Sequence, residues 1–217
     1  MDNDYVHVTQ ALSILRKLGL EYWFRTNSAE FCDAESKKSK EIGTLVHEVI
    51  QKHIEKEAIS FETKYPQEVK NCLESFFLFK KDYPKIKLKQ AEQLVTSKHY
   101  GYCGTLDCLA KENGELMIID WKSGKCEVGT KKEKDAPPVY PEHEYQVSAY
   151  VNAYNEQSKA NISKAGVLVL AKDKVAYNYR TIVGNALEEM FNEVFLPALK
   201  IYNYQNKNKN KEVHSNG

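Results

Sequence analysis

The chain has 217 residues, of which 42% are hydrophobic and 28% charged, and this length is sufficient to bury the core of one compact domain. No apolar run approaches the roughly 18 residues of a membrane span, and the acidic start of the chain argues against a secretory signal. We therefore expect a cytoplasmic protein whose five cysteines are free thiols. The net charge of +1 does not by itself indicate a nucleic-acid-binding protein.

Residues 1–85 have mainly the apolar periodicity of helices. We expect helices over 8–25 and 40–57, separated by a polar loop over 26–40. A third helix is predicted from Val69 onward, and it ends near Pro84 because proline cannot continue a helix.

From residue 86 the pattern changes to that of strands, which we expect over 86–98, 103–111 and 115–121. The Asn113-Gly114 pair predicts a tight hairpin turn between the second and third of these strands. After a Gly/Lys/Pro-rich loop over 123–140 we expect a helix over 142–157, strands over 165–171 and 175–183, and a helix over 186–204.

This order of elements predicts an α/β fold with a mixed central sheet flanked by helices and with an N-terminal helical elaboration. We expect a single domain over 1–204, in which 86–183 form the sheet core and 184–204 the C-terminal helix. The Asn/Lys-rich residues 205–217 are expected to be a disordered tail.

The run from Met117 to Ser123 is apolar but contains Asp120 and Lys122. Side chains alternate along a strand, so these two residues point to the same side. Burial of Asp120 is costly unless a partner or a metal compensates its charge. With Asp107 on the preceding strand, the acids can hold a divalent cation, and the lysine can meet the charge of a phosphate. A turn aspartate and a structural ion pair are the alternatives.

His47 has Ile50 and Ile54 at helical spacing, so it faces the apolar side of its helix. A lone histidine in such a place is more often a core residue than a metal ligand.

Four short motifs together resemble the PD-(D/E)XK nuclease superfamily, and within it the RecB-like exonuclease branch of phage exonucleases, mitochondrial genome maintenance exonucleases and CRISPR-associated RecB-type nucleases. Their order along the chain matches the order in that family. The motifs are Gly43-Thr44-Leu45-Val46-His47, Gly104-Thr105-Leu106-Asp107, Asp120-Trp121-Lys122 and Gln146-Val147-Ser148-Ala149-Tyr150.

The resemblance implies a restriction-endonuclease-like fold and roles for particular residues. His47, Asp107, Asp120 and the backbone carbonyl of Trp121 would hold Mg²⁺ or Mn²⁺, and Asp107 and Asp120 would thereby be catalytic. Lys122 would stabilise the phosphate charge, while Gln146 and Tyr150 would close over the site. No iron–sulfur cluster is expected, because no cysteine follows Cys126.

The implied substrate is DNA, either single strands or DNA ends. We expect contacts to the nucleic acid from aromatic rings, a hydroxyl and a basic loop, at Tyr100, Tyr102, Ser123, Lys131 and Lys132. Glu92 is a further candidate, for a second metal or a water.

The sequence therefore predicts a metal-dependent DNA exonuclease that acts in replication, repair or recombination. A structure-selective endonuclease on the same fold and a non-catalytic nucleic-acid-binding module remain alternatives. A helicase or recombinase partner is left open, and no membrane partner is expected.

Overall fold

The computed structural model describes residues 5–57, 65–126 and 136–215, with side chains described as far as residue 207. Its centre is a six-stranded mixed sheet in which β1, β3, β4, β5 and β6 follow one another and β2 pairs with β3. The strands are β1 (Val6–His7), β2 (Ile86–Ser97), β3 (Tyr102–Glu112), β4 (Glu115–Gly124), β5 (Lys164–Ala171) and β6 (Tyr177–Val183).

The pairing directions confirm the predicted mixed α/β fold. Strands β2, β3 and β4 form an antiparallel meander, β4 runs parallel to β5, and β5 is antiparallel to β6. Asn113 and Gly114 both have positive φ, of 52° and 92°, as a two-residue turn between twisted strands requires. The expected hairpin is thus present.

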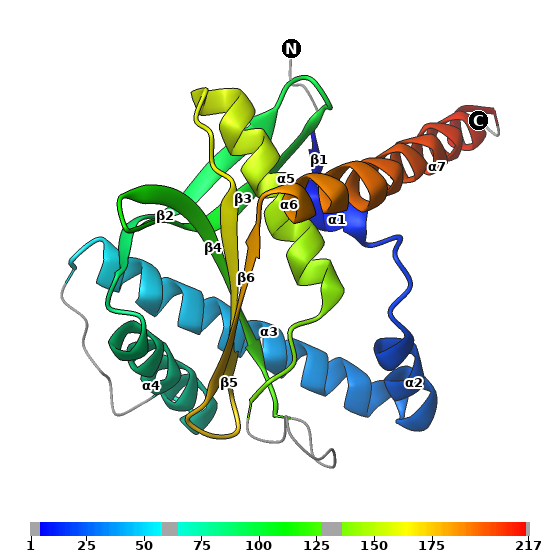
Figure 1. Cartoon of the computed structure of the whole chain (residues 1–217). Helices are drawn as coiled ribbons and strands as arrows, with labels where there is room; N and C mark the ends of the chain where they lie inside the picture. The colour runs from blue at the N-terminus through cyan, green and yellow to red at the C-terminus, as the bar shows by residue number, and fades with distance from the viewer. Residues whose placement is uncertain (1–4, 58–64, 127–135, 216–217) are drawn as a thin grey trace.

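Helices cover both faces of the sheet (Figure 1). One face carries α3 (Ala29–Ile54) and α4 (Gln67–Asp82), and their apolar residues form one core cluster with the sheet. The other face carries α5 (Pro141–Ser158), which packs with α1 (Val8–Leu12), α6 (Asn185–Glu189), the π-helix η1 (Met190–Phe195) and the start of α7 (Leu196–Ser215) around a second core cluster.

Strand alternation divides the residues of β4 between the two cores. Ile119 and Trp121 belong to the cluster under α3 and α4, whereas Ile118 belongs to the cluster under α5. Asp120, between two residues of the first set, therefore lies on the α5 side.

The predictions for the N-terminal part are wrong in two places. The predicted helix over 8–25 is two helices, α1 and α2 (Leu18–Thr26), and most of the predicted loop over 26–40, from Ala29 onward, belongs to α3. This polar stretch is helical because Ser28 caps it, accepting a hydrogen bond from the Phe31 N–H at 3.3 Å. Ion pairs to other segments also hold it, Lys38 to Glu68 and Glu35 to Lys125.

The C-terminal tail also differs from the expectation. Helix α7 continues to Ser215 where a disordered tail was expected, since no glycine or proline interrupts the chain between Pro197 and Gly217. Figure 1 shows α7 projecting away from the sheet. Among the described residues, no helix combines the length and apolar character that crossing a bilayer demands.

Candidate metal and catalytic site

Strands β3 and β4 separate at Asp107. Their pairing runs from Glu112 opposite Glu115 to Cys108 opposite Ile119, and it stops there. Beyond that point the Trp121 N–H donates a hydrogen bond to Asp107 Oδ2 at 2.8 Å. The Trp121 N–H is thus bonded to a side-chain carboxylate instead of a backbone carbonyl of the neighbouring strand. This hydrogen bond fixes both the Asp107 carboxylate and the following part of β4.

Asp120 is fully buried on the α5 side of this separation. Lys122 Nζ lies 2.6 Å from Asp120 Oδ2, as strand alternation predicts for residues two positions apart. Neither Asp120 oxygen makes a well-aligned hydrogen bond to a described residue. A buried carboxylate with so little compensation is costly, and a cation on its free oxygen would supply what is lacking.

His47 reaches the same place from α3, on the opposite side of the sheet. Its Nδ1 lies 3.5 Å from Asp107 Oδ1, and its Nε2 lies 3.2 Å from the Trp121 carbonyl oxygen. A carbonyl can only accept, so Nε2–H is the donor, and Nδ1 faces the carboxylates. Nδ1 can then either carry a proton or ligate a cation.

Glu92 completes the group. Its Oε1 lies 3.7 Å from His47 Nδ1, and the ligand atoms of His47, Glu92 and Asp107 all lie within 4.8 Å of one another. Glu92 has φ of 50°, which non-glycine residues rarely adopt, and it falls between the paired residues Ala91 and Gln93 of β2. From the sequence, Glu92 was only a further candidate, because the alternation of residues along β2 does not reveal that Glu92 interrupts the pairing.

We call His47, Glu92, Asp107, Asp120 and Lys122 the strand-split cluster. Burial raises the pKa of Asp107, and the negative charge of Asp120 raises it further. Burial lowers the pKa of Lys122, but the charges of Asp120 and Asp107 raise it by more, so the ammonium keeps its proton. The pKa of His47 is raised in the same way, because Glu92 and Asp107 outweigh its burial.

The donor set fits a hard divalent cation. It consists of carboxylate oxygens, a peptide carbonyl beside them and one imidazole, and it has more acids than Lys122 alone can compensate. Mg²⁺ prefers oxygen ligands, and an imidazole in the set suits Mn²⁺ as well.

Gln146 and Tyr150 lie on α5, on the same side of the sheet as Asp120. Gln146 Nε2 donates to the Tyr150 hydroxyl at 2.7 Å, and both side chains are buried. The ring of Tyr150 passes so close to Gly104 that a Cβ there would lie 2.6 Å from Tyr150 Cε1. The glycine of the Gly104–Asp107 motif is therefore explained by close packing against α5.

His143 is a residue that the sequence analysis missed. It lies three residues before Gln146 on α5, and its Nδ1 is buried without a hydrogen bond to a described residue. Burial and then the positive charge of Lys122 lower its pKa to about 4, so the imidazole is neutral near pH 7. The i, i+3 spacing to Gln146 was the signal that could have identified it.

The residues predicted to contact nucleic acid differ in their exposure and in their distance from the cluster. Tyr102 is fully buried, and its hydroxyl donates to the Ala149 carbonyl at 2.9 Å, so its ring cannot stack on a base and that prediction is wrong. Its place at the start of β3 directs it under α5, a covering that strand alternation alone does not reveal. Tyr100 is 37% exposed, and its ring packs on Phe191 rather than beside Asp107.

Ser123 is half-buried on β4, where a Cβ on Gly43 of α3 would lie 3.8 Å from its Oγ. Lys131 and Lys132 lie outside the described residues. A groove of about 530 Å³ runs along α3 to the cluster, and it is lined by Lys40, Gly43, Thr44, His47, Glu48, Gln51 and Glu92.

Two curated relatives are similar to part of this chain. Mitochondrial genome maintenance exonuclease 1 of Homo sapiens is 26% identical over 126 residues, which are 57% of this chain and 34% of that protein. The protein of the same name from Xenopus tropicalis is 29% identical over 89 residues, which are 40% of this chain and 23% of that protein. The chain thus spans about a third or less of the length of these relatives.

A solved structure from Eubacterium rectale, described as a candidate exonuclease, superposes with a TM-score of 0.53 at 14% sequence identity. The superposition covers 93% of this chain and 82% of that one, so the two proteins share a fold. No family model matches the chain. The four motifs gave a resemblance to the PD-(D/E)XK exonucleases, and these comparisons agree with it.

Proposed function

We propose that this chain, which has the fold of an exonuclease-like protein and exonucleases among its relatives, is a metal-dependent DNA exonuclease that hydrolyses phosphodiester bonds. The proposal goes beyond fold and sequence similarity, because those establish neither the activity nor the substrate of this chain.

One observation carries the proposal: the acids of the strand-split cluster converge with a protonated lysine at one point. Asp107 and Asp120 come from different strands and His47 from a helix more than fifty positions earlier, yet all three reach the separation of β3 and β4. A structural ion pair needs one acid for one base. Two buried acids close together, with the charge of Asp120 raising the pKa of Asp107, instead favour a cation-binding role.

In this proposal Asp107, Asp120, His47 and the Trp121 carbonyl hold Mg²⁺ or Mn²⁺, and Glu92 joins them from β2. A bound divalent cation lowers the pKa of a water and draws negative charge from a phosphate oxygen. The hydrogen bond from the Trp121 N–H orients the carboxylate of Asp107 before any ion binds.

Lys122 supplies positive charge in this scheme and is not the base. Its pKa is raised by its neighbours, so it is an ammonium that donates to a phosphate oxygen and stabilises the charge that grows there during hydrolysis. The neutral His143 and the Gln146–Tyr150 pair lie on α5 beside it, and we assign them to positioning the strand.

The path of the DNA strand is proposed to follow the space between α2 and the start of α5. A cleft of about 810 Å³ lies there, lined by Lys17, Trp23, Tyr140 and Tyr145 among others. Tyr140 lines this cleft and is 49% exposed, and such a ring can stack on an unpaired base.

The test uses the purified chain with end-labelled single-stranded DNA, end-labelled duplex and closed circular DNA, each with Mg²⁺, Mn²⁺ or EDTA. We expect cleavage that needs a metal and a free end. Asp120→Ala and Lys122→Ala should each lower the rate by at least about a hundredfold with the fold retained by circular dichroism. Lys125→Ala, which removes an exposed lysine that pairs with Glu35 instead, is the matched control and should cleave normally.

Different results point to different functions. Cleavage of closed circles would replace the exonuclease by an endonuclease on the same fold. Unchanged rates in both Asp120→Ala and Lys122→Ala would overturn the assignment of the site altogether.

A further inference from the structure

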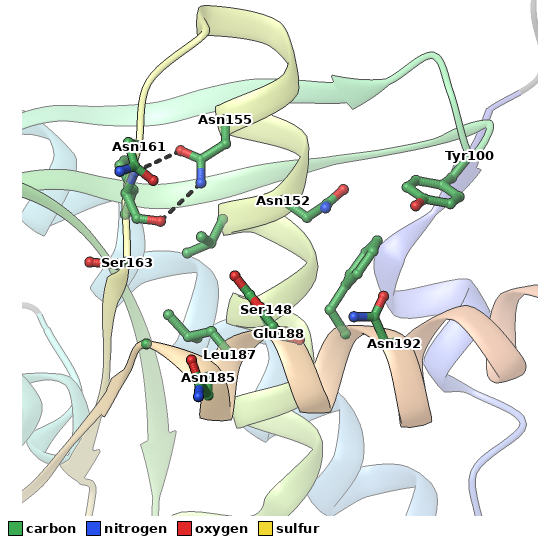
Figure 2. Close-up of a pocket in the computed structure, with 14 residues that line it drawn as sticks. Tyr100, Ser148, Asn152, Asn155, Asn161, Ser163, Asn185, Leu187, Glu188 and Asn192 are labelled. Carbon is green, nitrogen blue, oxygen red and sulfur yellow. Dashed lines mark hydrogen bonds between the residues drawn. The ribbon is translucent and has the colours of Figure 1, made fainter.

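A second pocket lies on the side of α5 that faces away from the strand-split cluster. It has a volume of about 460 Å³ and is bounded by α5, by residues 161–163 before β5, and by α6 and η1 (Figure 2). Ser148, Asn152 and Asn155 line it, and on a helix these positions lie opposite Gln146 and Tyr150. The pocket is therefore separate from the proposed metal site, with one helix between the two.

Asparagine side chains dominate the polar lining. Asn155 builds the wall, because its Nδ2 donates to the Ile162 carbonyl at 2.9 Å and its Oδ1 accepts from the Ile162 N–H at 2.8 Å (Figure 2). Asn152 uses only its Oδ1, which lies 3.0 Å from the Tyr102 hydroxyl, so its Nδ2 stays a donor for the pocket. Asn185 and Asn192 line the pocket without a hydrogen bond to a described residue.

An amide places a donor and an acceptor side by side, which matches the hydrogen-bonding edges of purines and pyrimidines. An aromatic ring stands at one end of the pocket. Tyr100 is 37% exposed and rests edge to face on the buried Phe191, with 5.4 Å between ring centroids. The ring of His99 also packs edge to face on Tyr100, with 4.4 Å between centroids. A base that stacked on the exposed part of the Tyr100 ring would add to the amide contacts.

The charge of the pocket excludes a phosphate. Glu188 is the charged member among the described residues that line it, and no lysine or arginine is among them. A carboxylate repels a phosphate group but accepts a hydrogen bond from an exocyclic amine. We propose that this pocket binds a nucleobase, either of a free nucleoside or of an unpaired nucleotide in a strand whose phosphates stay outside.

The experiment is a titration of the full chain in EDTA, followed by the side-chain amide NMR signals of asparagine. Because no metal is present, binding is measured apart from cleavage, and a failure here would leave the proposed nuclease untouched. We expect deoxyadenosine or another deoxynucleoside to shift the Asn152, Asn185 and Asn192 signals saturably. A short single-stranded oligonucleotide that shifts the same signals at lower concentration would identify a strand as the source of the base.

Variants then test the lining. Asn192→Leu and Tyr100→Leu should each weaken binding by at least about tenfold, since each removes a hydrogen-bonding or stacking partner. Asn206→Leu, on α7 outside the pocket, is the control and should bind normally. Asn152 is left intact because its Oδ1 lies 3.0 Å from the buried Tyr102 hydroxyl, so its loss could disturb the core.

Three outcomes would overturn the proposal. The first is the absence of saturable shifts with every deoxynucleoside and with the oligonucleotide. The second is binding of deoxyadenosine monophosphate tighter than deoxyadenosine, which would contradict the charge argument. The third is equal binding of ribose, which offers hydroxyl groups but no planar ring.

Discussion

Two groups of charged side chains lie next to β4, and they differ in how their charges are compensated. In the first, Lys125 pairs with Glu35 at 3.1 Å and Lys38 pairs with Glu68 at 2.5 Å, one acid to one base, with side chains from about a third to two-thirds exposed. We call these pairs the α3 strap. In the strand-split cluster Asp107 and Asp120 are buried, and they outnumber the lysine.

The comparison distinguishes ion pairs that hold a helix in place from a group of charges that can bind a ligand. Exposed pairs such as those of the α3 strap cost little to form and contribute little to stability. Buried acids in excess of their partners are unfavourable for folding alone, so their presence indicates that something outside the chain compensates them. Substitutions in the strand-split cluster should therefore lower activity without lowering stability. Substitutions in the α3 strap should slightly lower stability without changing activity.

The largest effect is expected from Asp120→Asn, which keeps the shape and removes the charge. Cleavage should fall by at least about a hundredfold, because the amide is a poor ligand for the cation. Stability in EDTA should be unchanged or higher, because the repulsion between Asp107 and Asp120 is relieved. Initial rates and thermal unfolding in EDTA measure both, and a less stable variant would contradict the account of the buried charge.

His47→Gln should mainly raise the concentration of metal ion that cleavage requires. The imidazole Nδ1 faces Asp107 and Glu92, so its loss removes one ligand and leaves the carboxylates in place. We expect the Mn²⁺ concentration for half-maximal cleavage to rise by at least about tenfold, with part of the activity recovered at high metal. An unchanged metal dependence would mean that His47 is the core histidine that its helix position alone suggests.

Gly104→Ala tests the contact between the cluster and α5. The added Cβ would lie 2.6 Å from the ring of Tyr150, which must then move, and the Gln146 hydrogen bond moves with it. We expect activity to fall by about tenfold, less than for a ligand, since positioning alone is lost. The companion Gly43→Ala, whose Cβ would meet Ser123 at an ordinary 3.8 Å, should be nearly normal.

Much of this site follows from local periodicity. The same-side arrangement of Asp120 and Lys122 is a property of any strand, and the inward direction of His47 is a property of its helix. Periodicity does not reveal that the pairing of β3 and β4 stops at Asp107. The contact of Asp107 with the Trp121 N–H and the inclusion of Glu92 depend on where two strands part and on one residue of positive φ, and neither has a sequence signal.

The wrong predictions have a similar origin in contacts between distant segments. Residues 29–40 are too polar to indicate a helix. Their helix is held by one partner on α4 and by another just after β4, which lie 30 and 90 positions further along the chain. Tyr102 was expected near the substrate because of its place in the sequence. Its burial is decided by α5, to whose backbone its hydroxyl is bonded.

A pH effect on stability should distinguish the wild type from Asp107→Asn in EDTA. Burial raises the pKa of Asp107, so its contribution to stability is fully present below the ordinary aspartate pKa of about 3.9 and is lost as the pH rises through the folded value. Relative to the variant, the wild type should therefore become less stable from acidic to neutral pH. Thermal unfolding over this range measures the difference, and parallel curves would refute it.

The smallest effect is expected in the α3 strap. Lys125→Gln removes one exposed ion pair, so the unfolding temperature should fall by no more than about 3 °C, and less in high salt because the pair is screened. Cleavage should be unchanged. If this variant lost activity as Asp120→Asn does, the N-terminal half of α3 would belong to the reactive site rather than to its support, and the division between the two groups of charges would fail.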